Sequence, residues 1–190
     1  MMTEIRILSR GGQGGVTGAK LLAKAGHIDN KYVQAIPKYG AERKGAPIYA
    51  DVRIADEHVK THAPVIPSNT HSWIVLEPSL IETIPFDDLR PGTIVIINAK
   101  EIPPILKEQK ALKIGIVDGV SIAQECGLIK SGTVMVSTTM LGAWIKASNN
   151  LISLDALKEA TKYQFKSGDL LDSNIKSIER AYEQFEFVIN

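Results

Sequence analysis

The sequence predicts an α/β fold: a Rossmann-like open sheet, mostly parallel, with helices on both faces and a mixed or antiparallel edge. Three features favour it. A strand, a glycine-rich turn and a helix follow one another near residue 1. Three later strands are continuous apolar runs, which is typical of parallel strands covered on both faces, and helix-sized connections separate them. Because 190 residues carry no internal repeat or linker, we expect a single domain over residues 1–190.

The spacing of apolar residues predicts the first strands and the first helix. A strand is predicted over residues 5–8, a glycine-rich turn over 11–15, and a helix from residue 16, where apolar residues recur at helical spacing. A second strand over 32–36 ends at Pro37. The polar stretch that follows, residues 38–47, is predicted to be a loop because glycine and proline punctuate it.

The third predicted strand, residues 48–54, alternates strictly between two faces. Its second face carries Tyr49, Asp51 and Arg53, so we expect it to be half exposed and to form the antiparallel or mixed edge. The continuous apolar strands follow at residues 73–76, 93–97 and 114–117.

In the last third of the chain, the sequence pattern predicts three helices. Two are expected over residues 135–146 and 153–165. The third carries an apolar stripe and has cap candidates at its start. The stripe consists of Ile175, Ile178, Tyr182 and Phe185, and the cap candidates are Asp172, Ser173 and Asn174.

Composition excludes several classes of protein. The 22 basic and 21 acidic residues give a net charge of +1, which does not favour a nucleic-acid partner. Cys126 is the only cysteine, so we expect no disulfide framework, no cysteine zinc site and no iron–sulfur cluster on this chain alone. With no signal-like start and no apolar run of about 20 residues, we expect a cytoplasmic protein without a membrane partner.

The glycine-rich turn is the strongest local motif. Backbone N–H groups and a helix amino end meet there, which suits a phosphate or carboxylate. It is not the dinucleotide fingerprint, because Thr17 stands where the third glycine belongs and no acidic residue follows the second strand, so NAD is not expected. A tight turn that lets the helix pack closely is the structural alternative, and both remain open. The long amide of Gln13 favours a ligand.

Two segments together resemble the gamma subunit of 2-oxoacid:ferredoxin oxidoreductases. The first is Ser9-Arg10-Gly11-Gly12-Gln13-Gly14-Gly15-Val16. The second is Tyr39-Gly40-Ala41-Glu42-Arg43-Lys44-Gly45-Ala46-Pro47, at a spacing that fits. Residues 140–143 resemble the family's late helix, although the stretch 137–139 lacks the asparagine expected there, and residues 174–182 match more weakly.

The resemblance implies a subunit of an enzyme that converts pyruvate, a branched-chain 2-oxoacid or 2-oxoglutarate to acyl-CoA. Thiamine diphosphate is then held by alpha and beta partners, iron–sulfur clusters by a delta subunit or elsewhere, and ferredoxin accepts the electrons. The sequence of this chain is consistent with thiamine diphosphate on partner chains, since neither Val117-Asp118-Gly119 nor Ser167-Gly168-Asp169 is the Gly-Asp-Gly thiamine motif. No catalytic residue and no activity of the isolated chain are expected.

The resemblance also suggests what the two segments bind. CoA is the anionic ligand in need of a site, and we expect Arg10, Gly11, Gly12, Gln13, Gly14 and Gly15 to help hold its phosphates. Tyr39, Glu42, Arg43 and Lys44 are expected to contact either CoA or a partner subunit, without a preference between the two. The rival hypotheses are a purely structural assembly module and a free-standing Rossmann-like oxidoreductase.

Five other residues are expected to carry no function. His58 and His62 could share a helix face, but no third metal ligand is evident. Cys126 is expected to be a buried thiol, and Trp73 and Trp144 to fill a core or an interface.

Overall fold

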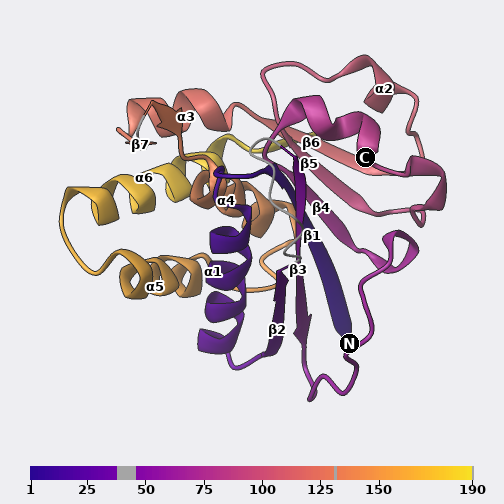
Figure 1. Cartoon of the computed structure of the whole chain (residues 1–190), viewed down its shortest axis with the longest axis horizontal. Helices are drawn as coiled ribbons and strands as arrows, with labels where there is room; N and C mark the ends of the chain where they lie inside the picture. Colours follow the sequence, from indigo (N-terminus) through magenta and orange to yellow (C-terminus); the bar gives the residue numbers. More distant parts are fainter. Residues whose placement is uncertain (38–45, 131, 190) are drawn as a thin grey trace.

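The structure, a computed structural model, describes residues 1–37, 46–130 and 132–189. Its centre is a seven-stranded sheet of order β2-β3-β1-β4-β5-β6-β9 (Figure 1). The strands are β1 (Met2–Arg10), β2 (Tyr32–Pro37), β3 (Pro47–Ala55), β4 (Ser72–Val75), β5 (Ile94–Asn98), β6 (Lys113–Val117) and β9 (Glu186–Ile189). A separate hairpin joins β7 (Ile129–Lys130) to β8 (Thr133–Val134).

Strand directions confirm the predicted mixed sheet. β1, β4, β5 and β6 pair in parallel. β3 runs antiparallel to both β1 and β2, and β9 runs antiparallel to β6. The parallel centre thus lies between two antiparallel edges, of which only the β3 side was predicted.

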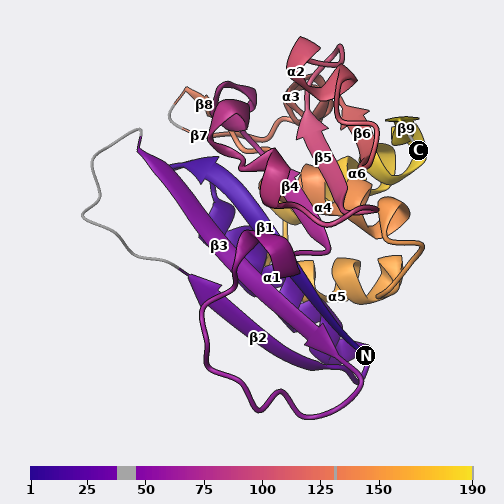
Figure 2. The same ribbon diagram turned by 90° about the vertical axis from the view of Figure 1, so that its right-hand side faces the viewer.

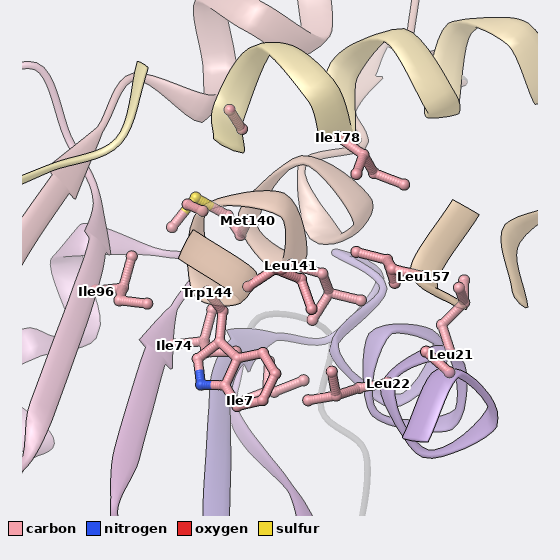
Figure 3. Packing of buried hydrophobic residues seen from close by; sticks show 14 of the residues in the cluster. Ile7, Leu21, Leu22, Ile74, Ile96, Met140, Leu141, Trp144, Leu157 and Ile178 are labelled. Atoms are coloured by element: carbon pink, nitrogen blue, oxygen red, sulfur yellow. The ribbon is translucent and has the colours of Figure 1, made fainter. Parts of the chain in front are cut away.

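The longer helices gather on one face of the sheet (Figures 1 and 2). They are α1 (Gly15–Ile28), α3 (Gly119–Glu125), α4 (Ser137–Ala147), α5 (Leu154–Phe165) and α6 (Asp169–Gln184). α4 lies in the middle of this layer and is almost wholly buried. Figure 3 shows its side chains Met140, Leu141 and Trp144 between the sheet residues Ile7, Ile74 and Ile96 and the helix residues Leu21, Leu22, Leu157 and Ile178. The buried positions of Trp73, Trp144 and Cys126 confirm their predicted packing roles.

The opposite face is covered by short helical turns. They are α2 (Pro104–Lys107) and the 3-10 turns η1 (Pro67–Asn69), η2 (Pro78–Thr83) and η3 (Phe86–Asp88). Buried residues of these connections pack on Trp73, Val95 and Ile97. The sequence predicted helix-sized connections here, and the chain instead uses tight turns rich in proline, which opens three of these four segments.

The prediction of a half-exposed β3 was wrong. Asp51 is 0 % exposed and Arg53 is 2 % exposed. Arg6 of β1 donates two hydrogen bonds to Asp51, at 2.6 Å from Nε and 2.8 Å from Nη2, and Arg53 donates to Glu4 at 2.7 Å. Backbone carbonyls of the segment 61–65 accept further hydrogen bonds from both guanidinium groups. The loop after β3 therefore folds back over this face and closes it from water.

The start of α6 also differs from the prediction. The helix begins at Asp169, so the predicted caps at 172–174 lie inside it. Asn174 is buried, and its Oδ1 accepts a 2.6 Å hydrogen bond from the Thr138 hydroxyl of α4. Two helices packed this closely need a small residue between them, and Gly142 supplies it: a Cβ there would lie 2.2 Å from the carbonyl oxygen of Ile178.

No helix in the described ranges is long and apolar enough to cross a membrane.

Candidate functional site

The glycine-rich turn lies where the sheet topology changes direction. After β1 the chain passes through α1 to β2 and β3 on one side, whereas after β4 it continues to β5 on the other. Ligands of open α/β sheets bind at this switch, beyond the carboxyl ends of the two strands. Residues 11–14 follow β1, and Glu77 follows β4, so the sequence motif occupies the crevice of the fold.

Two of the glycines make the turn itself. Gly12 has φ +91° and Gly14 has φ +85°, a left-handed conformation that other residues rarely adopt. Within the turn, the backbone N–H of Gln13 donates a hydrogen bond to the backbone carbonyl of Arg10 at 3.2 Å. Gly14 precedes α1 without a side-chain cap, so the first N–H groups of that helix are left for a ligand or for water.

Close packing explains other glycines. A Cβ on Gly15 would lie 2.3 Å from the Ser9 Oγ, and one on Gly14 would lie 2.8 Å from the Ser137 Oγ. Around Gly12, by contrast, nothing lies within 4 Å of a built Cβ. The structural alternative thus accounts for Gly14 and Gly15, while Gly12 faces open space.

A pocket of ≈ 310 Å³ opens over the turn. We call it the loop pocket; it is lined by Ser9, Arg10, Gly12, Gly14, Gly15, Val16, Thr17, Ile48 and Met135. Among the lining residues that the structure describes, Arg10 alone is charged, and the amino end of α1 forms the floor of the pocket. This combination of a helix start, glycine backbone and a guanidinium group is suited to an anion.

Gln13 does not point to a ligand in this structure. Its Oε1 accepts from the Arg10 backbone N–H at 2.7 Å, and its Nε2 donates to Glu77 at 2.7 Å. Arg10 in turn donates to the Ser79 hydroxyl at 2.9 Å. The amide that was expected to reach a ligand instead ties the turn after β1 to the turn after β4.

Glu77 is held ionised by this network. Its partial burial opposes ionisation, but hydrogen bonds from Ser79 and Gln13 and the nearby charge of Arg10 outweigh that effect and lower its pKa. Sequence reasoning missed Glu77, although an acidic residue directly after an apolar parallel strand is a usable signal for a crevice residue.

The lowered pKa predicts a pH dependence of stability. Because the pKa of Glu77 is lower in the folded than in the unfolded chain, its contribution is present above the ordinary value of 4.5 and is lost as pH falls through the folded-state pKa. Glu77→Gln should therefore reduce the loss of unfolding free energy on acidification. Denaturant titrations over this pH range measure it, with Glu82→Gln, an exposed carboxyl of η2, as the control. Equal acid sensitivity of Glu77→Gln and the unmodified protein would contradict the assignment.

The second predicted segment lies outside the described residues. This applies to Tyr39, Glu42, Arg43 and Lys44. The chain is described again from Ala46, and Pro47 at the start of β3 pairs in register with Arg10. Ile48 then lines the loop pocket. The segment therefore ends beside the glycine-rich turn.

The two histidines that were not expected to bind a metal do not line the loop pocket. His58 and His62 are exposed in the irregular segment after β3 and share no helix. In the described part of the chain, no group of three or more His, Cys, Asp or Glu side chains could hold a metal ion.

Comparison with known proteins places the chain. Residues 4–184 match the family described as pyruvate ferredoxin/flavodoxin oxidoreductase. The pyruvate/ketoisovalerate oxidoreductases common subunit gamma of Thermococcus kodakarensis is 38 % identical, covering 96 % of this chain and 97 % of the relative. Pyruvate synthase subunit PorC of Methanothermobacter marburgensis is 37 % identical, covering 97 % and 98 %.

A solved structure agrees with the fold. The crystal structure of pyruvate oxidoreductase subunit PORC from Thermotoga maritima superposes with a TM-score of 0.81 at 28 % identity, and covers 98 % of each chain. This likeness confirms the predicted α/β fold, and the matches over nearly the whole length confirm the resemblance carried by the two motifs. The chain belongs to the pyruvate ferredoxin/flavodoxin oxidoreductase family.

Proposed function

We propose that this chain is the gamma-type subunit of a multisubunit 2-oxoacid:ferredoxin oxidoreductase, folded as one domain over residues 1–190. The observation that carries the proposal is similarity along the whole chain: relatives named as subunit gamma or PorC match over 96–97 % of it and are themselves covered over 97–98 %. The substrate is pyruvate or a branched-chain 2-oxoacid, in line with the pyruvate/ketoisovalerate name of one relative.

In this assignment the redox chemistry belongs to partner chains. Alpha and beta subunits hold thiamine diphosphate, a delta subunit or another part of the assembly holds the iron–sulfur clusters, and ferredoxin receives the electrons. The composition of this chain is compatible with that division, since Cys126 is its single cysteine and is buried. We assign no catalytic residue to it.

The role proposed for its own residues is to hold CoA. The loop pocket offers backbone N–H groups at the start of α1 and a guanidinium group at its rim, both of which bind phosphate. The glycine backbone at Gly12 leaves room for a ligand to approach. Arg43 and Lys44 would add charge-assisted contacts either to CoA or to a partner chain.

A negative charge placed in the turn tests CoA binding. Gly12→Asp should raise the Michaelis constant for CoA of the assembled enzyme about tenfold or more, since like charges 4 Å apart repel by about 1 kcal/mol in water and about 4 kcal/mol near a protein surface. The measurement is CoA-dependent ferredoxin reduction at saturating 2-oxoacid.

Gly92→Asp is the matched control. Gly92 also has a positive φ, +80°, and open space around a built Cβ, but it lies in the turn before β5. Both variants therefore carry the same backbone strain and the same new charge. We expect an unchanged Michaelis constant for Gly92→Asp. An unchanged Michaelis constant for Gly12→Asp in an intact complex would contradict the CoA assignment.

The alternative is a purely structural module in which the turn only packs, as Gly14 and Gly15 do. Hydrogen exchange separates the two. CoA should slow exchange of the amides of residues 12–17 in the CoA-binding case and leave them unchanged in a structural module.

A further inference from the structure

The two edges of the central sheet differ in how they are protected. An edge strand is normally kept short, charged or bulged, because an open edge can pair with a strand of another chain. At one edge, β9 has four residues, begins with Glu186 and pairs with β6 in an interrupted register. At the other edge, β2 pairs regularly over residues 32–37 and contains no charged side chain (Figure 2). β2 is therefore the less protected edge.

The register of the sheet shows which backbone groups β2 leaves open. Asp56 donates its N–H to the Met1 carbonyl, and bonded and non-bonded pairs alternate along an antiparallel ladder. Odd-numbered residues of β1 therefore bond even-numbered residues of β3, and the odd-numbered residues of β3 bond residues 32, 34 and 36 of β2. The N–H and C=O groups of Val33 and Ala35 consequently point away from the sheet, where no residue in the described ranges bonds them.

Pro37 agrees with this assignment. Its partner is Ala50, and this pair falls in the non-bonded phase of the β2–β3 ladder. Proline, which has no N–H, is found in sheets at edge positions of this kind. The ladder therefore loses nothing at Pro37, and the open donors of this edge are the N–H groups of Val33 and Ala35.

A groove lies beside the open edge. We call it the edge groove; it has a volume of ≈ 460 Å³ and is lined by residues 32–34 of β2 and by His58, Val59, Lys60 and His62. Tyr32 is 49 % exposed, and its ring meets the His58 ring at an angle of 64° with centroids 5.8 Å apart. The Gln34 amide donates to the Thr61 carbonyl at 3.2 Å. Tyr32 and Gln34 thus lie on the face of β2 that the segment after β3 partly covers.

A strand added to β2 would present side chains to this groove. Successive side chains of a strand point to opposite faces of the sheet, and residues opposite each other on neighbouring strands share a face. Every second residue of an added strand would therefore lie beside Tyr32 and Gln34, at the edge groove. In strand addition, main-chain hydrogen bonds supply affinity and such pockets for alternate side chains supply specificity.

The charge of the edge groove favours a carboxylate. Lys60 is exposed, and no Asp or Glu is among the described lining residues. Of the nearest acidic residues, Asp56 is paired with Lys31 and the N-terminal ammonium, and Glu57 lines a neighbouring pocket. The two imidazole rings of the groove can also donate to an acceptor. A carboxylate placed here would gain charge-assisted hydrogen bonds.

We propose that the β2 edge and the edge groove bind an extended segment of a partner subunit, which adds a strand to the sheet and places a carboxylate beside Lys60. The proposal rests on the proposed function and names a contact within that assembly. A second copy of this chain fits less well. Two-fold pairing of β2 with itself would set both edge grooves side by side on one face, so that the two Lys60 ammonium groups repel each other.

Hydrogen exchange at single residues tests the strand addition. The isolated chain is compared with its assembly with the alpha, beta and delta chains. The amides of Val33 and Ala35 should exchange about tenfold or more slowly in the assembly, the equivalent of one hydrogen bond. Those of Gln34 and Ile36, already bonded to β3, should change little. Unchanged rates at Val33 and Ala35 in the intact assembly would overturn the proposal, as would the same protection in a dimer of this chain alone.

A charge reversal tests the carboxylate contact. Lys60→Glu should weaken the assembly about tenfold or more, because like charges across an interface repel. The dissociation constant is measured by analytical ultracentrifugation of the co-purified chains. Lys107→Glu is the control: it makes the same charge change at an exposed lysine of α2 that does not line the edge groove. Equal dissociation constants for the two variants would contradict the carboxylate contact.

A backbone donor is removed by Ala35→Pro. The lost N–H points away from β3, so the β2–β3 ladder keeps its bonds, and the assembly should weaken by about two- to tenfold, the range for one hydrogen bond. Ala35→Ser, which keeps the N–H, is the control and should leave the dissociation constant unchanged. Circular dichroism checks that both variants are folded. A folded Ala35→Pro variant that assembles as tightly as Ala35→Ser would contradict the backbone contact.

Co-purification separates this proposal from the proposed function. If the alpha, beta and delta chains do not co-purify with the unmodified chain, the proposed function itself is wrong. If they co-purify while the amides of Val33 and Ala35 exchange as in the isolated chain, only the strand addition is wrong.

Discussion

Replacing Asp51 by alanine is expected to lower the free energy of unfolding by about 3–5 kcal/mol, the cost of removing one partner from a buried ion pair. Arg6 would keep its charge at 4 % exposure, between the rings of Tyr49 and Trp73 and with the Val65 carbonyl as a remaining acceptor. The two short hydrogen bonds that Asp51 accepts from the guanidinium would be lost. Urea titration of the full chain measures the change.

Two further variants make this result specific. Glu159→Ala breaks an exposed pair with Lys162 on α5 and should change stability by less than about 1 kcal/mol. The double variant Arg6→Met with Asp51→Leu should recover much of the loss, because no charge is then left buried. A loss below about 1 kcal/mol for Asp51→Ala would show that solvent reaches this face of β3, contrary to the structure.

Gly142→Ala is expected to destabilise the chain by about 3 kcal/mol, the upper part of the range for overpacking a core. The new methyl would meet the backbone of α6, with the Ile178 carbonyl oxygen at 2.2 Å and its Cα at 2.9 Å. Backbone cannot rotate away as a side chain can, so α4 and α6 would have to separate. Their hydrogen bond between Thr138 and Asn174 would lengthen or break.

Gly18→Ala is the matched control on another helix. Gly18 also lies inside a helix, α1, but a Cβ there would meet Ile7 and Ser137 at 3.6 Å, an ordinary contact. The substitution should be neutral or stabilise by up to about 1 kcal/mol, since alanine favours a helix interior over glycine. Thermal unfolding of both variants measures the contrast, and equal effects of the two would refute the close crossing of α4 and α6.

Periodicity located most of the fold. The alternating and continuous apolar runs placed β1 and β3 to β6 to within a few residues, because each pattern records which faces of a strand are covered. It could not show that the segment 61–65 folds over the second face of β3, since the Val65 carbonyl accepts a hydrogen bond from Arg6, 59 residues away in the chain, and the Ala63 carbonyl accepts one from Arg53. Local polarity therefore suggested exposure where the chain buries two ion pairs.

The sequence also failed to predict the start of α6 and the short strand β9. Asp172, Ser173 and Asn174 have the side chains of capping residues, but α6 starts after Gly168, and Asn174 is used to bond α4. β9 follows α6 directly as four residues and carries no alternation long enough to identify. In both cases tertiary contacts outweighed local preference.

The site was predictable in part. The glycine-rich turn after the first strand was located from sequence, because only glycine combines a left-handed turn with a close approach of the helix. Glu77 was missed, since it comes from the turn after β4, far from the motif in sequence. The engagement of Gln13 with Glu77 also depends on this long-range arrangement.

The most direct test of the central claim is reconstitution. The chain, carrying an affinity tag, is co-expressed with the alpha, beta and delta chains of the proposed assembly, and the purified material is assayed for 2-oxoacid- and CoA-dependent reduction of ferredoxin. We predict that the partner chains co-purify with this one and that omission of this chain abolishes the activity. Recovery of the tagged chain alone, with full activity in the chains that remain, would contradict it.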